Sequence, residues 1–199
     1  MAATSQTFLF MDLVGFTALT AERGDDDAAE LALRLYDGVR PLLAQHCAEE
    51  VKTIGDAMMV RCEDPQLAVR LGVKIVDALA ASEGFPPLRV GVHTGTAVTR
   101  NGDWYGSAVN VAARLCAAAA GGEVLVSEAT RGAAGKLSGV ELGERQLHWL
   151  KHVPEPVAAW PVSECPSTPR RRPFRSLLSR KRRCLADVSI ALRHSEVTG

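Results

Sequence analysis

Apolar residues recur along the chain with two alternating periods, which predicts a mixture of strands and helices. Short apolar runs typical of buried strands lie at 7–14, 47–54, 57–62, 87–93 and 123–126, and 140–162 has the pattern of a broken strand pair. Apolar residues at helical spacing lie in 26–45, 65–82 and 106–119. The order β-α-β-β-α-β followed by extra strands predicts an α+β fold, a ferredoxin-like βαββαβ sandwich with a C-terminal strand extension.

The composition changes near Ser163, so we expect one folded domain over 1–162. Residues 163–199 hold nine basic and three acidic residues, against 14 basic and 20 acidic in residues 1–162. Three prolines within 164–173 predict a Pro/Arg-rich linker. Beyond it, apolar residues at helical spacing alternate with arginines. Residues 170–193 are therefore either a disordered, solvated tail or a basic amphipathic helix that contacts an anionic membrane or a partner.

Hydropathy and cysteine usage predict a cytoplasmic protein. No apolar run approaches the ~18 residues of a membrane-spanning helix, and the first residues lack the positive charge of a secretory signal. The five cysteines are odd in number, widely spaced and without a C-x-x-C pair, which indicates reduced thiols. Membrane association is expected only through the basic tail.

Two aspartates stand where a carboxylate needs compensation. Asp12 lies at the end of an apolar strand, and Asp56 follows Gly55 in a predicted hairpin turn. In a β-α-β-β arrangement the strand after that turn lies beside the first strand, which brings the two carboxylates together. Such a pair is commonly stabilised by a divalent metal ion. Alternatively, Asp56 only makes the turn and Asp12 caps a helix that begins near Gly15.

Asn110 and Arg114 form a second candidate group, because they stand four residues apart on one face of a predicted helix. An arginine with fixed planar donors, close to a helix start, suits an oxyanion, although a solvated helix face has the same pattern. The chain has neither a Walker-type loop nor a G-x-G-x-x-G loop. His148 and His152 lie in a predicted strand without a glutamate partner, which argues against a zinc site.

Four ordered motifs resemble those of class III nucleotidyl cyclase catalytic domains. They are Phe10-Met-Asp-Leu-Val-Gly-Phe-Thr17, Val51-Lys-Thr-Ile-Gly-Asp56, Arg89-Val-Gly-Val-His-Thr-Gly95 and the segment from Asp103 to Arg114. The resemblance runs from about Phe8 to Val162 and leaves the tail outside.

The resemblance implies a role for each matching residue. Asp12 and Asp56 would hold two Mg²⁺ or Mn²⁺ ions that activate the ribose 3′-hydroxyl for attack on the α-phosphorus and hold the triphosphate. Asn110 would orient the ribose, and Arg114 would stabilise charge on the α-phosphate. Lys151 matches a lysine that contacts the terminal phosphates, although His152 replaces the glycine that usually follows it.

Lys52 and Asp103 match the purine-reading pair of the family. A lysine and a carboxylate complement N1 and the 6-amino group of adenine, whereas guanine would leave polar groups unpaired at about 1–3 kcal/mol each. The resemblance thus implies an adenylate cyclase that converts ATP to 3′,5′-cyclic AMP and pyrophosphate.

The family's sites lie between two domains, and this chain carries both sets of site residues. The resemblance therefore implies a head-to-tail homodimer, whose apolar contacts would be consistent with Trp104, Tyr105 and Trp149. No nucleic-acid partner is expected. A guanylate cyclase and a catalytically silent, nucleotide-binding regulatory domain are the alternatives.

Overall fold

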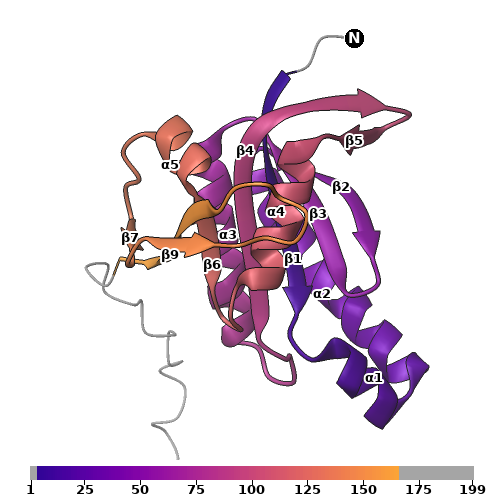
Figure 1. Cartoon of the computed structure of the whole chain (residues 1–199). Helices are drawn as coiled ribbons and strands as arrows, with labels where there is room; N and C mark the ends of the chain where they lie inside the picture. Colours follow the sequence, from indigo (N-terminus) through magenta and orange to yellow (C-terminus); the bar gives the residue numbers. More distant parts are fainter. Residues whose placement is uncertain (1–3, 166–199) are drawn as a thin grey trace, which may run out of the picture. The chain divides into compact units, whose positions relative to one another are not determined.

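The computed structural model describes residues 4–165, which form one sheet with helices on both faces (Figure 1). The strands are β1 (Thr4–Leu13), β2 (Ala48–Ile54), β3 (Ala57–Cys62), β4 (Leu88–Arg100), β5 (Asp103–Tyr105), β6 (Val124–Ser127), β7 (Val140–Leu142), β8 (Gln146–His148) and β9 (Val157–Glu164). The helices are α1 (Phe16–Arg23), α2 (Asp25–Gln45), α3 (Pro65–Ala80), α4 (Ser107–Ala118) and α5 (Glu128–Ala134). Neighbouring strands follow the order β2-β3-β1-β4-β6-β9-β7, with β5 beside β4 and β8 beside β9.

The first four strands of this order confirm the predicted ferredoxin-like arrangement. Strand β1 lies between β3 and β4 and is antiparallel to both, and β2 forms an antiparallel hairpin with β3. Strands β6 to β9 extend the sheet at its other edge, where the patterns of 123–126 and 140–162 predict additional strands.

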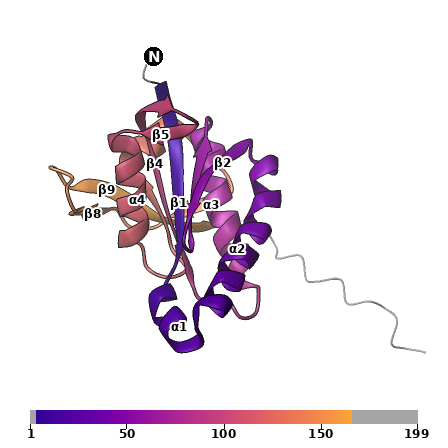
Figure 2. The ribbon, with the colours of Figure 1, turned by 90° about the vertical axis from the view of Figure 1, so that its right-hand side faces the viewer.

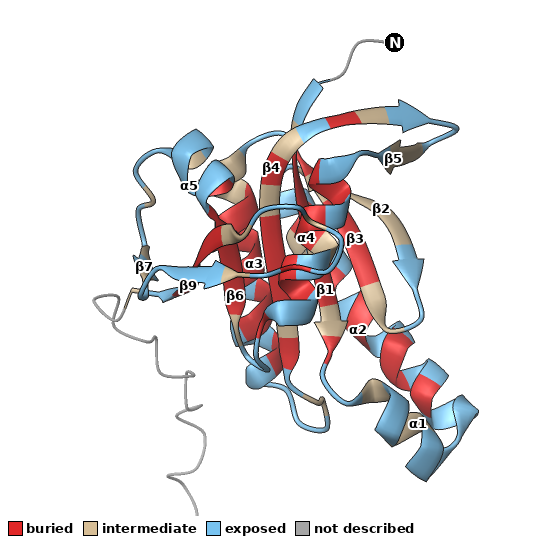
Figure 3. Cartoon of the chain, in the orientation of Figure 1, coloured by how far each residue is buried: buried red, intermediate tan, exposed pale blue. Residues whose placement is uncertain are grey.

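The sheet separates α2 and α3 on one face from α4 on the other (Figure 2). On the first face, Leu9 and Met11 of β1 pack in the main apolar core with the two helices. On the second face, Phe8 of β1 packs with Ala108 and Ala112 of α4. Successive strand residues point to opposite faces, so Asp12 shares the α4 face with Phe8. Buried positions concentrate on the central strands and on the helix faces that cover them (Figure 3).

Two glycines let α4 approach the backbone of β4. A Cβ on Gly91 would lie 2.2 Å from the backbone nitrogen of Cys116 and 2.6 Å from the carbonyl oxygen of Ala112. A Cβ on Gly95 would lie 3.0 Å from the Cβ of Ala108. The position of α4 therefore depends on the absence of side chains along this line of β4.

Several elements differ from the sequence-based expectation. A helix beginning near Gly15 was considered only in the alternative interpretation of Asp12; α1 does begin there, but its N-cap is Gly15 and not Asp12, and none of its residues is buried. Helix α5 and strand β5 were not predicted, and β4 continues to Arg100 where the pattern indicated an end near His93. His152 lies in a turn with φ 62°, outside the strand that was expected to hold it.

At the C-terminal end, β9 reaches Glu164, two residues past the predicted domain boundary. The predicted basic segment 170–193 lies outside the described residues. Between residues 4 and 165 no two cysteines form a disulfide, and no helix there combines the length and apolar character needed to cross a bilayer.

Candidate active site

Asp12 and Asp56 lie together at one end of the sheet. The antiparallel pairing of β1 with β3 reaches Met11 and Met58, so the turn between β2 and β3 lies beside the end of β1. The backbone N–H of Leu13 donates a hydrogen bond to Asp56 Oδ2 at 3.1 Å, and Asp12 is close enough to raise the pKa of Asp56. The structure thus brings together the two predicted metal ligands, by the topology expected for them.

The electrostatics of this pair favour a bound cation. Burial, followed by the hydrogen bond to Asp12 and its charge, raises the pKa of Asp56 to about 6. Within residues 4–165 no group of three or more acidic, histidine or cysteine side chains is arranged to hold a metal ion. Magnesium is usually bound by one or two carboxylates together with substrate phosphates, so a two-carboxylate set fits an ion that arrives with a nucleotide.

Arg89 is a member of this group that the motif analysis did not assign. Its Nε, at 2.9 Å, and its Nη2 both donate to Asp12 Oδ2 in an ion pair. Nη1 also donates to the carbonyl oxygen of Ala117, near the end of α4, at 3.0 Å. The guanidinium compensates the charge of Asp12 and would be released toward other anions if a metal ion took that carboxylate.

Tyr36 supports the turn that carries Asp56; in the sequence it lies within the helical apolar pattern of 26–45 and gives no further signal. Its buried ring lies on α2, and its hydroxyl donates a hydrogen bond to the carbonyl oxygen of Gly55. Gly55 has φ +61°, in the left-handed region that glycine adopts without strain. The turn is therefore fixed by the left-handed conformation of Gly55 and by the hydrogen bond from Tyr36 on α2.

Lys52 and Asp103 form an ion pair between β2 and β5. Lys52 Nζ lies 2.6 Å from Asp103 Oδ2, and both side chains are partly exposed. The hydrogen bond from Lys52 is the main cause that lowers the pKa of Asp103. The structure joins these residues across 51 positions of sequence, and both functional groups remain accessible to a ligand.

The other three predicted residues are exposed and are not bonded to these pairs in the described chain. Asn110 and Arg114 lie on α4, which follows β5 through Gly106, and Lys151 lies in the turn after β8. Within residues 4–165 their side chains form no hydrogen bond or ion pair with one another, with the carboxylates or with the Lys52–Asp103 pair. Arg89 reaches the end of α4 at Ala117, whereas Asn110 lies seven residues earlier, about 10 Å along the helix axis.

Comparison with known families decides what kind of domain this is. The model of the adenylate and guanylate cyclase catalytic domain matches residues 2–151. This chain belongs to that family. A pH-sensitive adenylate cyclase of Mycobacterium tuberculosis is 43% identical over 133 residues, which make up 67% of this chain and 33% of that protein. The chain spans about a third of the length of the curated relatives it matches.

Solved cyclase structures share the fold. An adenylate cyclase from Trypanosoma brucei, studied in its monomeric state, has a TM-score of 0.74 at 22% identity, covering 82% of this chain and 89% of that chain. The guanylyl cyclase Cya2 has a TM-score of 0.71 at 23% identity, covering 84% and 96%. Because an adenylate and a guanylyl cyclase match almost equally well, the fold of this cyclase domain does not decide the base. That choice depends on individual side chains.

Proposed function

We propose that this cyclase domain is an adenylate cyclase, which converts ATP to 3′,5′-cyclic AMP and pyrophosphate at sites shared between two copies of the chain. The observation that carries the proposal is the presence of two separate groups in one chain: the Asp12–Asp56 carboxylates and the Lys52–Asp103 ion pair. The family membership supports cyclase chemistry in general. The side chains of the second group support ATP.

The first group suits the metal-bound triphosphate. Two Mg²⁺ or Mn²⁺ ions at Asp12 and Asp56 would supply activation of the ribose 3′-hydroxyl and neutralisation of the triphosphate. Asp56, with its raised pKa, and Asp12 provide the oxygen ligands, and the N–H of Leu13 holds Asp56 Oδ2 in place. Arg89, next to Asp12, adds a positive charge on the same side as the phosphates.

Asn110, Arg114 and Lys151 suit the ribose and the phosphates. Asn110 would donate to and accept from the ribose, and Arg114 would stabilise the negative charge that grows on the α-phosphate. Both side chains are exposed and without an ion pair or hydrogen bond inside the described chain, as expected for residues whose partner is a ligand. Lys151, exposed in its turn, would contact the terminal phosphates.

Lys52 and Asp103 favour adenine over guanine. An ammonium donates to N1 of adenine and a carboxylate accepts from its 6-amino group, while guanine has a donor at N1 and an acceptor at position 6. Each mismatched, desolvated group costs about 1–3 kcal/mol, or roughly tenfold to a hundredfold in selectivity. An ion pair already formed in the free protein presents both groups together.

The separation of the carboxylates from Asn110 supports a homodimer. The carboxylates lie at the end of β1, and Asn110 lies toward the opposite end of α4. A second copy, placed head to tail, would bring its own Asn110 and Arg114 to the carboxylates of the first. Exposed apolar residues are present for such a contact, because Trp149 is 79% exposed and Tyr105 is 51% exposed. Trp104, in contrast, packs against Phe8.

We assign catalysis to residues 1–162 with the whole of β9, and leave residues 170–193 as a candidate membrane contact.

Purified protein incubated with ATP or GTP and either Mn²⁺ or Mg²⁺, followed by detection of cyclic product, tests the proposal. Cyclic AMP formation at a rate well above cyclic GTP formation is expected. Preferred use of GTP would favour a guanylate cyclase, and nucleotide binding without product would favour a silent regulatory domain.

A further inference from the structure

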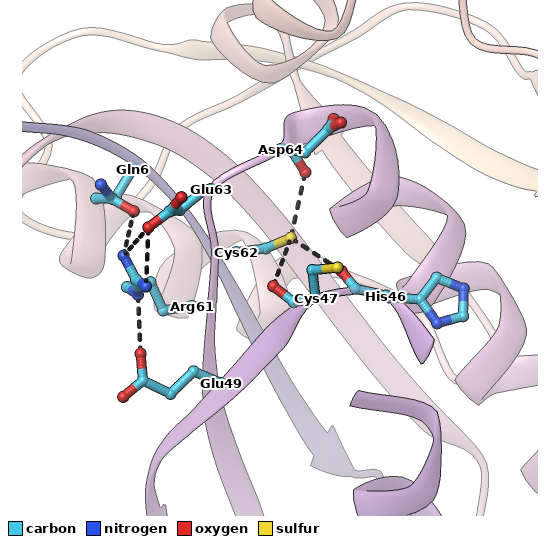
Figure 4. Close-up of polar contacts among 8 residues, drawn as sticks. All are labelled: Gln6, His46, Cys47, Glu49, Arg61, Cys62, Glu63 and Asp64. Carbon is cyan, nitrogen blue, oxygen red and sulfur yellow. Dashed lines mark hydrogen bonds and ion pairs between the residues drawn. The ribbon is translucent and has the colours of Figure 1, made fainter. Parts of the chain in front are cut away.

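Arg61 on β3 is held by polar side chains from several parts of the sheet (Figure 4). Its Nη1 donates to Gln6 Oε1 of β1 at 2.8 Å, and its Nε donates to Glu49 Oε2 of β2 at 3.1 Å. Both terminal nitrogens donate to Glu63 Oε1 at 3.2 Å. Only 18% of the Arg61 side chain is exposed, although Glu49 and Glu63 are largely in solvent. These contacts fix the plane of the guanidinium.

The guanidinium of Arg61 also lies over the indole of Trp104 on β5, 5.3 Å from the ring centroid. Phe8 of β1 meets the same indole edge to face, with centroids 5.8 Å apart and an interplanar angle of 61°. Strand β5 has three residues, and in the described part of the chain β4 is its single ladder partner. Side-chain contacts to Trp104 therefore contribute much of what fixes the position of β5.

Trp104 is directly linked to the ion pair proposed to read the base. Its backbone N–H donates to Asp103 Oδ1 at 2.8 Å, while Asp103 Oδ2 accepts from Lys52 Nζ at 2.6 Å. Lys52 follows Glu49 by three residues on β2. Arg61 consequently contacts both strands of the pair: β2 through Glu49 and β5 through Trp104.

We propose that Arg61 is a positioning residue for base selection, which holds β2 and β5 at the separation at which Lys52 and Asp103 recognise the purine. The inference rests on the proposed function and assigns Arg61 no contact with the nucleotide. Hydrogen-bond strength falls steeply with misalignment, so a displaced pair would satisfy neither base well. Discrimination between ATP and GTP would then fall, because discrimination requires one base to be paired fully.

Steady-state kinetics of Arg61→Gln test this role. The variant keeps a polar side chain but loses the charge and the stacked guanidinium. We expect the ratio of kcat/KM for ATP to that for GTP to fall about tenfold, mostly through a higher KM for ATP. The kcat for ATP should change by less than about threefold, because the carboxylates and Arg114 are untouched. Arg61→Lys, which keeps the charge without the planar fork, should give an intermediate ratio.

Arg34→Gln is the matched control. Arg34 also stacks over an aromatic ring, that of Phe85, with its guanidinium carbon 4.9 Å from the centroid. It belongs to α2, a helix on the opposite face of the sheet from α4 (Figure 2). The control should keep the wild-type ratio. A folded Arg61→Gln protein whose ratio stays within about twofold of wild type would overturn the proposal.

A double-mutant cycle on stability separates this inference from the proposed function. Urea unfolding of Arg61→Gln, Asp103→Asn and the double variant measures whether the two effects add. Arg61 and Asp103 form no hydrogen bond or ion pair with each other in the described structure, so a bystander role predicts additivity. A positioning role predicts that Asp103→Asn changes the free energy of unfolding less in the Arg61→Gln protein than in the wild-type protein. If wild-type protein makes no cyclic nucleotide, the proposed function fails. The double-mutant cycle still decides whether Arg61 positions Asp103, and additive effects on stability would reject that role.

Discussion

At Asp56, the contribution of the negative charge to the site can be separated from the placement of the side chain. Asp56 is held by the N–H of Leu13, and its turn is held by Tyr36, so its placement does not require its own charge. Asp56→Asn keeps an oxygen acceptor for Leu13 and removes the repulsion with Asp12. We expect cyclase activity to fall by at least about a hundredfold, because a metal ligand is lost.

The same variant should remain folded, with a melting temperature within about 4 °C of wild type by differential scanning calorimetry. Asp26→Asn, at an exposed acid in the first turn of α2, is the charge-matched control and should retain activity. Activity of Asp56→Asn above half of the wild-type rate would contradict the assignment of Asp56 as a metal ligand.

His93 on β4 belongs to a buried chain of hydroxyl groups. Its Nδ1 lies 2.8 Å from Ser127 Oγ, and hydrogen bonds of 3.0, 3.1 and 2.9 Å continue through Thr130 and Thr94 to Thr7. Burial lowers the pKa of His93 to about 4, because the charged ring is poorly solvated there. The neutral ring thus contributes stability that is complete above about pH 6.5 and is lost as the pH falls toward 4.

We expect wild-type protein to lose roughly 2–3 kcal/mol more stability than His93→Gln between pH 7 and pH 4. Urea unfolding of both proteins at the two pH values measures this difference, and the subtraction cancels other groups that titrate over this interval. Equal losses in the two proteins would show that His93 is charged in the folded state.

Among the elements, α4 depends most clearly on a single backbone position. Gly91→Ala would place a methyl group against the backbone of α4 at Cys116 and Ala112. Both sides of this contact are backbone, of β4 and of α4, and neither can move aside as a flexible side chain could. We therefore expect a loss of more than about 2 kcal/mol in the free energy of unfolding. Activity should fall as well, because α4 carries Asn110 and Arg114.

Gly38→Ala is the control for this prediction. Gly38 lies within α2, and a Cβ there would meet no atom within 4 Å. Alanine has a higher helix propensity, so this variant should be stabilised by up to about 1 kcal/mol. Chemical denaturation of both variants checks the prediction, and a Gly91→Ala protein as stable as wild type would contradict the close approach of α4 to β4.

The elements that sequence patterns predict are those with a buried face. Helix α2 buries seven residues at helical spacing and was predicted almost to its bounds, whereas α1 buries none and gives no such pattern. The second half of β4 was missed because it is largely polar: residues 94–97 pair with the polar start of β1, and residues 98–100 pair with the short strand β5. Arg89, between Leu88 and Val90, looks like a solvent-facing strand residue, since its partner Asp12 lies 77 positions away. The pairs Asp12–Asp56 and Lys52–Asp103 were predicted from motifs and topology, and in the structure the two residues of each pair lie together.

At the scale of the whole molecule, the account requires two copies of the chain. Each copy would contribute carboxylates to one site and Asn110 with Arg114 to the other, so a C2 dimer contains two equivalent sites. An isolated copy would bind metal and nucleotide weakly and would turn over little ATP. The exposed Trp149 and Tyr105 are candidates for residues that such a dimer covers.

Mixing two inactive variants tests the shared site most directly. Asp56→Asn and Arg114→Ala should each be inactive alone, because each removes one half of both sites. After subunit exchange, about half of the dimers would be mixed, and each mixed dimer would contain one intact site, giving roughly a quarter of wild-type activity. Recovery of that size from cyclic AMP measurements on the mixture is the predicted result. No recovery after verified exchange, or full activity of a strictly monomeric protein, would contradict the account.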